Sequence, residues 1–344
     1  MTILYLLLTL LLFGVLVTLH EGGHFIVARL NGVAVKEFAI GMGPKILSFV
    51  SKKSGIRYSI RALPIGGYVS MEGEDFESDH PDSFEKKSVW RRISTVFAGP
   101  AVNIVVGFLC MLLLVGLSPS LASTEVHSFI EEGATSNEWL RSGDVVVKVN
   151  STAVHTGNEL TYEIMNQGHQ PIDLTVIRDG ERVVLDNVSF PTFEDSGAVF
   201  GQYDFYVVAA PKSVGNVIYY SFWRSVSTIK MVWDSLVGLI NGRFGMSAIS
   251  GPIGVSEVVG EATKSAFPIQ SLIYLMALLS INLGVMNFLP IPGLDGGRLL
   301  FLLIEAVTKK RLNRNIEGYI NAICVMILLG FIIFVSIKDV INLF

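Results

Sequence analysis

The chain has 344 residues, of which 51% are hydrophobic and 16% are charged, with a mean hydropathy of +0.53 and a net charge of -4. Ordinary soluble proteins carry about 25% charged residues, so this composition excludes that class and indicates an integral membrane protein. The negative net charge gives no reason to expect a nucleic-acid partner.

Four apolar stretches are long enough to cross a bilayer, whose hydrocarbon core needs about 20 helical residues. They cover residues 3–28, 94–117, 270–291 and 317–337. The sequence therefore predicts a polytopic α-helical membrane protein with about four transmembrane helices. A cleaved signal peptide is the alternative for the first stretch, but it has no basic start and no small-residue cleavage site.

The first apolar stretch contains His20-Glu21-Gly22-Gly23-His24. Residues four apart project from one face of a helix, so both imidazoles can face one Zn²⁺, with the glutamate beside the metal as general base. Ionisable groups in an apolar span are costly and mark a functional site by default. We expect one zinc ion per chain here. The two glycines either keep bulk away from the metal or allow close helix packing.

Glycine and strand-forming residues fill the segment 41–74, and residues 57–63 alternate polar and apolar until Pro64 interrupts them. This pattern predicts a β-hairpin or β-loop associated with the membrane. It is either a plain loop or an edge strand that binds an extended substrate through its main chain. The candidate substrate-binding residues are Arg57, Tyr58, Ser59, Ile60, Arg61, Ala62, Leu63, Gly66 and Gly67.

Residues 118–192 form a predicted β-rich domain, with strand-like runs at 144–150 and 172–177. The stretch from Ser142 to Asn150 resembles the Gly-Asp-x-Ile-x-x-Val-Asn signature of PDZ domains, although Ser151 stands where a glycine is usual. We expect an inserted PDZ-like domain whose ligand would be a peptide or protein. Only one such domain fits in this segment.

The following segment, 193–268, reads as a linker that contains an amphipathic helix at about 214–240. Large apolar residues recur there at helical spacing, among them Trp223 and Trp233, while Arg224, Lys230 and Asp234 interrupt them. This pattern is typical of a helix at the membrane interface. A fifth span is the alternative, which the charges disfavour.

Charge asymmetry between the loops gives an orientation. The interval 29–92 holds eleven Lys and Arg residues and the short loop 298–314 holds five, whereas the segment 118–269 holds nine against seventeen Asp and Glu. By the positive-inside rule, the basic loops are cytoplasmic, and both termini and the inserted domain are outside. The predicted location is the bacterial cytoplasmic membrane, with spans one and three parallel.

A catalytic zinc site needs a third protein ligand and an open position. Asp295 follows the third span and lies at the same predicted depth as the two histidines, towards the cytoplasmic side. Glu305 is the nearest rival. Taken alone, Asp295 would read as part of an Asp-Gly turn. Pro290 and Pro292 break the helix before it, and such irregular backbone persists only beside protein or water.

Four motifs in order resemble the site-2 protease type of intramembrane metalloprotease, in its bacterial regulator of sigma-E protease branch. They are the histidine motif, Gly66-Gly67-Tyr68-Val69, the run 97–103 that reads Phe-Ala-Gly-Pro-Ala-Val-Asn, and the run 282–297. The resemblance implies that His20, His24 and Asp295 bind zinc and that Glu21 activates water. It also implies that Asn287 and residues 57–63 hold the substrate.

A protein of this type is expected to hydrolyse peptide bonds in the transmembrane segments of single-span membrane proteins, such as anti-sigma factors or remnant signal peptides. The domains follow as 1–117 and 269–344 for the two halves of the membrane core, with 118–192 and 193–268 between them. The alternatives are a PDZ-bearing membrane scaffold with an inactive metal site, and a zinc transporter.

Overall fold

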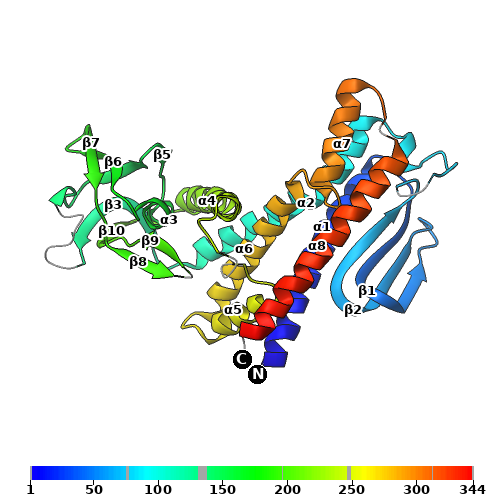
Figure 1. Ribbon diagram of the computed structural model, residues 1–344, viewed down its shortest axis with the longest axis horizontal. Coiled ribbons are helices and arrows are strands. Elements are labelled where there is room, and N and C mark those ends of the chain that lie inside the picture. The colour runs from blue at the N-terminus through cyan, green and yellow to red at the C-terminus, as the bar shows by residue number, and fades with distance from the viewer. Residues whose placement is uncertain are drawn as a thin grey trace. The chain divides into compact units, whose positions relative to one another are not determined.

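The computed structural model describes residues 2–74, 77–130, 138–195, 197–245, 249–311 and 313–342. Within these ranges, four helices are long and apolar enough to cross a membrane (Figure 1). They are α1 (Thr2–Leu30), α2 (Val89–Leu117), α6 (Pro268–Phe288) and α8 (Arg314–Asn342). The prediction of four such helices is confirmed. The third ends at 288 and not at 291, because Leu289 precedes a proline and adopts an extended backbone.

Two compact units make up the chain. The first consists of residues 1–107 and 250–344, and the second of residues 108–249, so the division falls within α2. Parts of the predicted regions 118–192 and 193–268, namely residues 131–137, 196 and 246–248, lie outside the description.

Helix α5 (Pro252–Lys264) belongs to the first unit, although the sequence predicts that its residues are part of the linker 193–268. Its Val259 is fully buried in an apolar cluster with Leu16 of α1 and Leu275 of α6. Asp339 of α8 accepts hydrogen bonds from the amides of Gly251 and Gly254, at 2.8 and 3.0 Å. The predicted linker therefore ends near residue 249, and the residues after it pack among the apolar helices.

The basic loop predicted at 298–314 is mostly helical. Helix α7 (Asp295–Thr308) begins directly after the turn that follows α6. It ends at Lys309, whose φ of 56° is left-handed, and its Leu299 and Leu302 are buried in a cluster with Ala28 of α1.

Close contact between α1 and α2 depends on one of the two motif glycines. A Cβ on Gly23 would lie 2.6 Å from the Ala98 carbonyl oxygen, whereas a Cβ on Gly22 would meet nothing within 4 Å. Gly23 thus serves helix packing, as small residues commonly do in membranes. Gly22 has no such steric requirement.

Strands β1 (Val35–Val50) and β2 (Arg57–Met71) form the predicted hairpin. The predicted interruption at Pro64 is wrong, because β2 continues through it with bulges in the register. The stretch 57–60 pairs on both sides, with 37–40 and with 47–50, while 67–71 pairs only with 35–40. The free edge next to 35–40 is therefore 67–71, whereas residues 57–60 of the predicted edge strand are an interior strand.

A buried carboxylate connects the two strands of this sheet. Glu37 accepts hydrogen bonds from Ser59 Oγ at 2.7 Å, Arg61 Nη2 at 3.1 Å and Lys45 Nζ at 3.2 Å. Burial alone would raise the pKa of Glu37, but these donors outweigh it and lower the pKa to about 2. The charged form is therefore the one that the sheet stabilises.

This pKa predicts an acid limit on stability. A carboxyl with a depressed folded-state pKa contributes stability above its unfolded value, about 4.5, and loses that contribution as the pH falls towards about 2. We expect the melting temperature of the purified protein to fall over this interval, and to fall less steeply in Glu37→Gln. Equal slopes for the two proteins would contradict the assignment.

The second unit contains a six-stranded antiparallel arrangement in the order β10-β3-β4-β6-β7, with β5 paired to β4. Its strands are β3 (Leu121–Phe129), β4 (Val145–Val149), β5 (Thr152–Ala153), β6 (Ile172–Arg178), β7 (Glu181–Val188) and β10 (Phe205–Ala210). A separate hairpin joins β8 (Thr192–Asp195) to β9 (Ala198–Gly201). A β-rich region is thus present, but β10 extends it beyond the predicted boundary at 192. Its PDZ identity stays a prediction.

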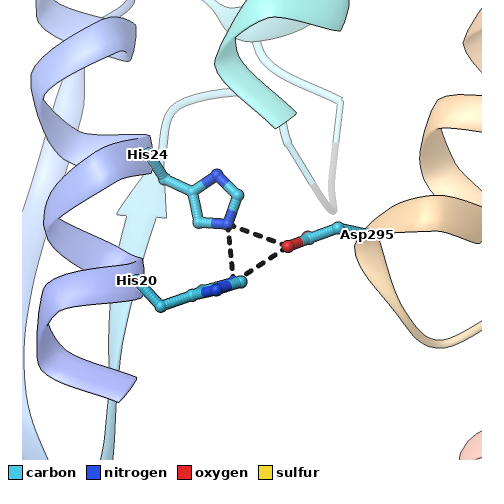
Figure 2. A group of neighbouring side chains, drawn as sticks. All are labelled: His20, His24 and Asp295. Carbon is cyan, nitrogen blue, oxygen red and sulfur yellow. Dashed lines mark hydrogen bonds and ion pairs between the residues drawn. The ribbon is translucent and has the colours of Figure 1, made fainter. Parts of the chain in front are cut away.

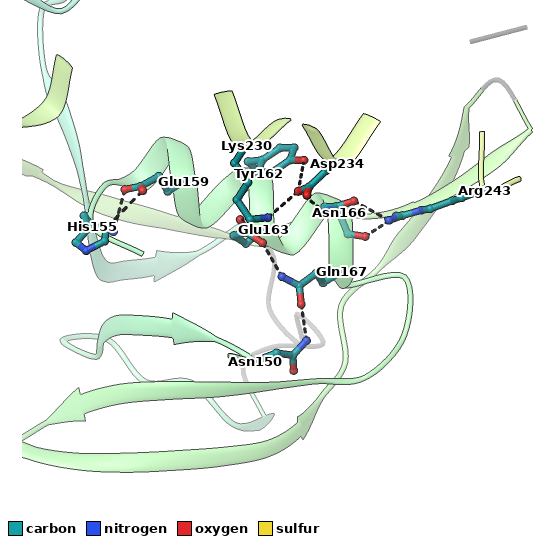
Figure 3. A network of polar contacts seen from close by, with 10 residues as sticks. All are labelled: Asn150, His155, Glu159, Tyr162, Glu163, Asn166, Gln167, Lys230, Asp234 and Arg243. Carbon is teal, nitrogen blue, oxygen red and sulfur yellow. Dashed lines mark hydrogen bonds and ion pairs between the residues drawn. The ribbon is translucent and has the colours of Figure 1, made fainter. Parts of the chain in front are cut away.

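Helix α4 (Val214–Ile240) coincides with the predicted amphipathic helix and is not among the four apolar spans. It joins α3 (Gly157–Gln167) through a polar network (Figure 3). Asp234 accepts from Tyr162 Oη at 2.9 Å, and Lys230 pairs with both Asp234 and Glu163 at 2.6 and 2.9 Å. This network fixes α4 to the β-rich region of its own unit.

Candidate metal centre

Three side chains from distant parts of the sequence meet in the first unit (Figure 2). His20 Nε2 lies 3.2 Å from His24 Nε2 and 2.9 Å from Asp295 Oδ2, and His24 Nε2 lies 3.2 Å from the same oxygen. Both histidines are buried. Among the described residues, this is the one group of at least three histidine, cysteine or carboxylate side chains with metal-binding spacing.

The local backbone explains how the aspartate reaches the histidines. Successive turns of α1 present the two imidazoles, and Asp295 is in the first turn of α7. A Cβ on Gly296 would lie 2.0 Å from the Leu289 carbonyl oxygen, and Gly293 has a φ of 92°. Only glycine adopts these positions without strain, so the Gly-rich turn directs the carboxylate towards α1.

Helix α2 contacts both imidazoles from behind. His24 Nδ1 lies 2.9 Å from the Thr95 carbonyl oxygen, and His20 Nδ1 lies 3.0 Å from Asn103 Nδ2. Because a carbonyl only accepts, His24 Nδ1 carries the proton and its Nε2 keeps a lone pair for a metal. A Cβ on Gly99 would lie 2.3 Å from His24 Nε2 and 2.7 Å from His20 Nε2. That glycine leaves room for the three candidate ligand atoms.

The three atoms fit a zinc ion. Ligand atoms around tetrahedral zinc with bonds of about 2.0–2.1 Å are roughly 3.3 Å apart. The three separations of 2.9–3.2 Å are close to that value. Two imidazoles and one carboxylate also form the usual donor set of a catalytic zinc site with one open position.

Glu21 and Asn287 line the same cavity as the ligand cluster, which has a volume of about 730 Å³. Glu21 Oε2 accepts a hydrogen bond from the Val69 amide at 3.0 Å. Both polar and apolar side chains line this cavity, among them Tyr68, Ser70, Met71, Glu74, Arg298 and Asn321. The side chain expected to act as base therefore lies beside the metal ligands.

The predicted substrate strand requires a correction. Residues 57–63 do not line the cavity, and 57–60 is flanked by paired strands on both sides. The cavity is instead bordered by the free edge 68–71. Gly67 lies close to α1, since a Cβ there would be 3.8 Å from Glu21 Cγ, whereas Gly66 lies against Met42.

The rival carboxylate is occupied elsewhere. Glu305 forms a bidentate ion pair with Arg92, with oxygen to nitrogen distances of 2.5 and 3.0 Å, and it also contacts Arg311 at 3.3 Å. It is not a member of the histidine cluster.

The sequence profile of peptidase family M50 matches residues 8–331. The chain belongs to peptidase family M50. A relative in Clostridium acetobutylicum, named as a candidate zinc metalloprotease, is 35% identical over 338 residues and covers 96% of each chain. The regulator of sigma-W protease RasP of Bacillus subtilis is 28% identical, covering 97% of each chain, and the zinc metalloprotease RasP of Bacillus licheniformis is 28% identical, covering 97% of this chain and 98% of its own.

This M50 membership confirms the predicted site-2 protease family, and the relatives' names support a zinc metalloprotease. The apolar helices together with the family support a membrane protein.

Sequence patterns predict no individual role for Thr95, Gly99 or Asn103, although the motif 97–103 contains the last two. The sequence does contain a signal for Asn103, because it is an uncharged polar residue in the middle of an apolar span. Polar side chains at such places face the helix bundle or a wet cavity. The contribution of Thr95 comes from its main chain, which no side-chain pattern reveals.

Proposed function

We propose that this chain is a zinc-dependent intramembrane endopeptidase that cuts transmembrane segments of single-span membrane proteins. The observation that carries the proposal is the meeting of His20, His24 and Asp295 beside a cavity that also contains Glu21. Two of its three members, His20 and His24, belong to α1, a helix that is apolar enough to cross a membrane. A peptidase site at such a place is suited to substrates that are themselves in the membrane.

Each side chain has a chemical task in this proposal. His20, His24 and Asp295 hold the metal and leave one position open. When bound, zinc supplies a Lewis acid that polarises the scissile carbonyl and increases the acidity of water. Glu21 takes a proton from the attacking water and passes it to the leaving amine, which keeps the peptide-bond hydrolysis balanced.

Substrate binding is assigned to the edge 68–71 in place of the interior stretch 57–60. A helical substrate hides its carbonyl groups in its own hydrogen bonds, so it must unwind before cleavage. Addition of the unwound segment to a free strand edge replaces those bonds. The Asn287 amide, which lines the same cavity, is proposed to bind a further main-chain group.

The membrane placement follows from loop charge. We propose that the site lies towards the cytoplasmic side, that both termini and the β-rich region are outside, and that α4 rests at the outer interface. The β-rich region is proposed to be a PDZ-like module that takes a peptide or protein ligand. Candidate substrates are anti-sigma factors and remnant signal peptides, and the Bacillus subtilis relative is named a regulator of sigma-W protease.

Glu21→Gln tests the enzyme assignment. We expect the variant to keep stoichiometric zinc, because Glu21 is not a ligand, and to lose cleavage of a single-span reporter protein by at least about a hundredfold, the usual scale for a general base. Metal analysis and a gel-based cleavage assay in proteoliposomes measure the two properties. His24→Ala is the companion variant and should lose both. Full activity in Glu21→Gln would refute the role, and a zinc-free wild-type protein would favour a scaffold.

A further inference from the structure

Asn103 lies in the middle of α2 and is not one of the proposed catalytic groups. It is fully buried, and its amide lies behind His20 with Nδ2 3.0 Å from His20 Nδ1. Its Oδ1 has no hydrogen-bond partner. The main-chain oxygen of Asn103 accepts from Ser280 Oγ of α6 at 2.7 Å, which ties this part of α2 to α6.

The orientation of the Asn103 amide, with Nδ2 nearest to His20, determines which nitrogen of the imidazole carries the proton. If Nδ2 donates to His20 Nδ1, that ring nitrogen holds a lone pair and the proton is on Nε2. Nε2 is the atom that faces His24 and Asp295. A protonated nitrogen cannot bind a metal, so this orientation suits His20 only while its Nε2 donates to the aspartate.

Exchanging the oxygen and nitrogen of the Asn103 amide moves the proton of His20 from Nε2 to Nδ1. Oδ1 then accepts from Nδ1–H and leaves the Nε2 lone pair free, as the Thr95 carbonyl does for His24. The oxygen and nitrogen of an amide have nearly the same shape, so the hydrogen-bond partners decide between the two orientations. In either orientation the amide has one partner, His20 Nδ1, and zinc binding by His20 Nε2 requires the orientation in which Oδ1 accepts from Nδ1–H. Ligating histidines usually donate their second N–H to such an acceptor.

We propose that Asn103 is a positioning residue that holds His20 in the Nδ1–H tautomer through its side-chain carbonyl. This inference rests on the proposed zinc site. The two ligand histidines are thereby oriented from one helix, His24 by a main-chain carbonyl and His20 by a side-chain carbonyl eight residues further along α2. Any residue at position 103 that keeps an acceptor at the same place should support zinc binding.

The test compares substitutions at position 103 by zinc affinity, measured by chelator competition on the full-length protein in detergent. Asn103→Leu keeps a similar volume and removes the acceptor, so we expect zinc to bind about 10- to 100-fold more weakly. Asn103→Asp keeps an acceptor oxygen and should bind at least as tightly as the wild type. Ser280→Ala removes the contact to the Asn103 main chain without touching His20, and its zinc affinity should be unchanged.

The outcomes separate this inference from the proposed function. If the wild type binds zinc and His24→Ala does not, the zinc site stands. Unchanged affinity in Asn103→Leu would then overturn the role of Asn103 alone. Should the leucine variant fail to fold, as judged by the melting temperature of the zinc-free protein, Asn103→Asp decides. A tenfold weaker affinity in that variant overturns the proposal, and wild-type affinity supports it.

Discussion

Gly99→Ala is expected to weaken zinc binding by about ten- to hundredfold and to lower proteolysis with it. The added methyl carbon would lie 2.3 Å from His24 Nε2 and 2.7 Å from His20 Nε2, closer than unbonded atoms approach. Either α2 moves away from α1 or both imidazoles turn, and each movement separates the three ligand atoms. Overpacking of this kind costs about 1–3 kcal/mol, which corresponds to a zinc affinity that is roughly ten- to hundredfold weaker.

The same helix offers a matched control. A Cβ on Gly116 would meet nothing within 4 Å. Gly116→Ala should therefore retain zinc and activity, and the better helix propensity of alanine makes destabilisation unexpected. Zinc content by elemental analysis, measured beside the melting temperature, distinguishes a blocked site from a misfolded protein. Normal zinc content in Gly99→Ala would show that the three residues do not bind the metal together.

Val69→Pro is expected to lower cleavage roughly ten- to hundredfold while leaving the sheet folded. The Val69 amide points to Glu21 and not to β1, so proline removes a donor at the free edge and no rung of the β1–β2 ladder. The variant loses the hydrogen bond that this amide donates to Glu21 Oε2, and an extended substrate at this edge would find no donor there, an effect of about 1–3 kcal/mol. The measurement is the cleavage rate of a single-span reporter in proteoliposomes.

Two comparisons sharpen the result. Val69→Ala keeps the amide and changes only the side chain, so it should cleave the reporter at a rate close to that of the wild type. Tyr68→Pro removes an amide that, by alternation, faces β1, so it should lower the melting temperature. Equal cleavage by Val69→Pro and Val69→Ala would exclude the edge 68–71 as the substrate strand.

Much of the membrane core could be predicted from the sequence because its signals are local. Apolar length identifies the four long helices, and helical spacing places His20 and His24 on one face. Asp295 required one further step, the parallel direction of two spans, which loop charge supplied. The structure brings these three residues together, and the M50 match supports the chemistry.

The errors concern features that depend on pairing between distant segments. Alternation at 57–63 is the same for an interior strand as for an edge strand, so only the register with β1 reveals which one borders the cavity. The residues of α5 follow a charged segment, and their place among the apolar helices depends on contacts with Leu16 and Leu275. Similarly, β10 joins its sheet by pairing with β3 across more than seventy residues.

The separation of 271 residues between His24 and Asp295 also determines when during synthesis the site can form. A ribosome adds about 5 to 20 residues per second, so roughly 15 to 50 seconds pass between the histidines and the aspartate. During that time, the second unit is made and the first unit consists only of its N-terminal piece. A nascent chain therefore contains His20, Glu21 and His24 without Asp295, so under the proposed mechanism it stays inactive until it is nearly complete.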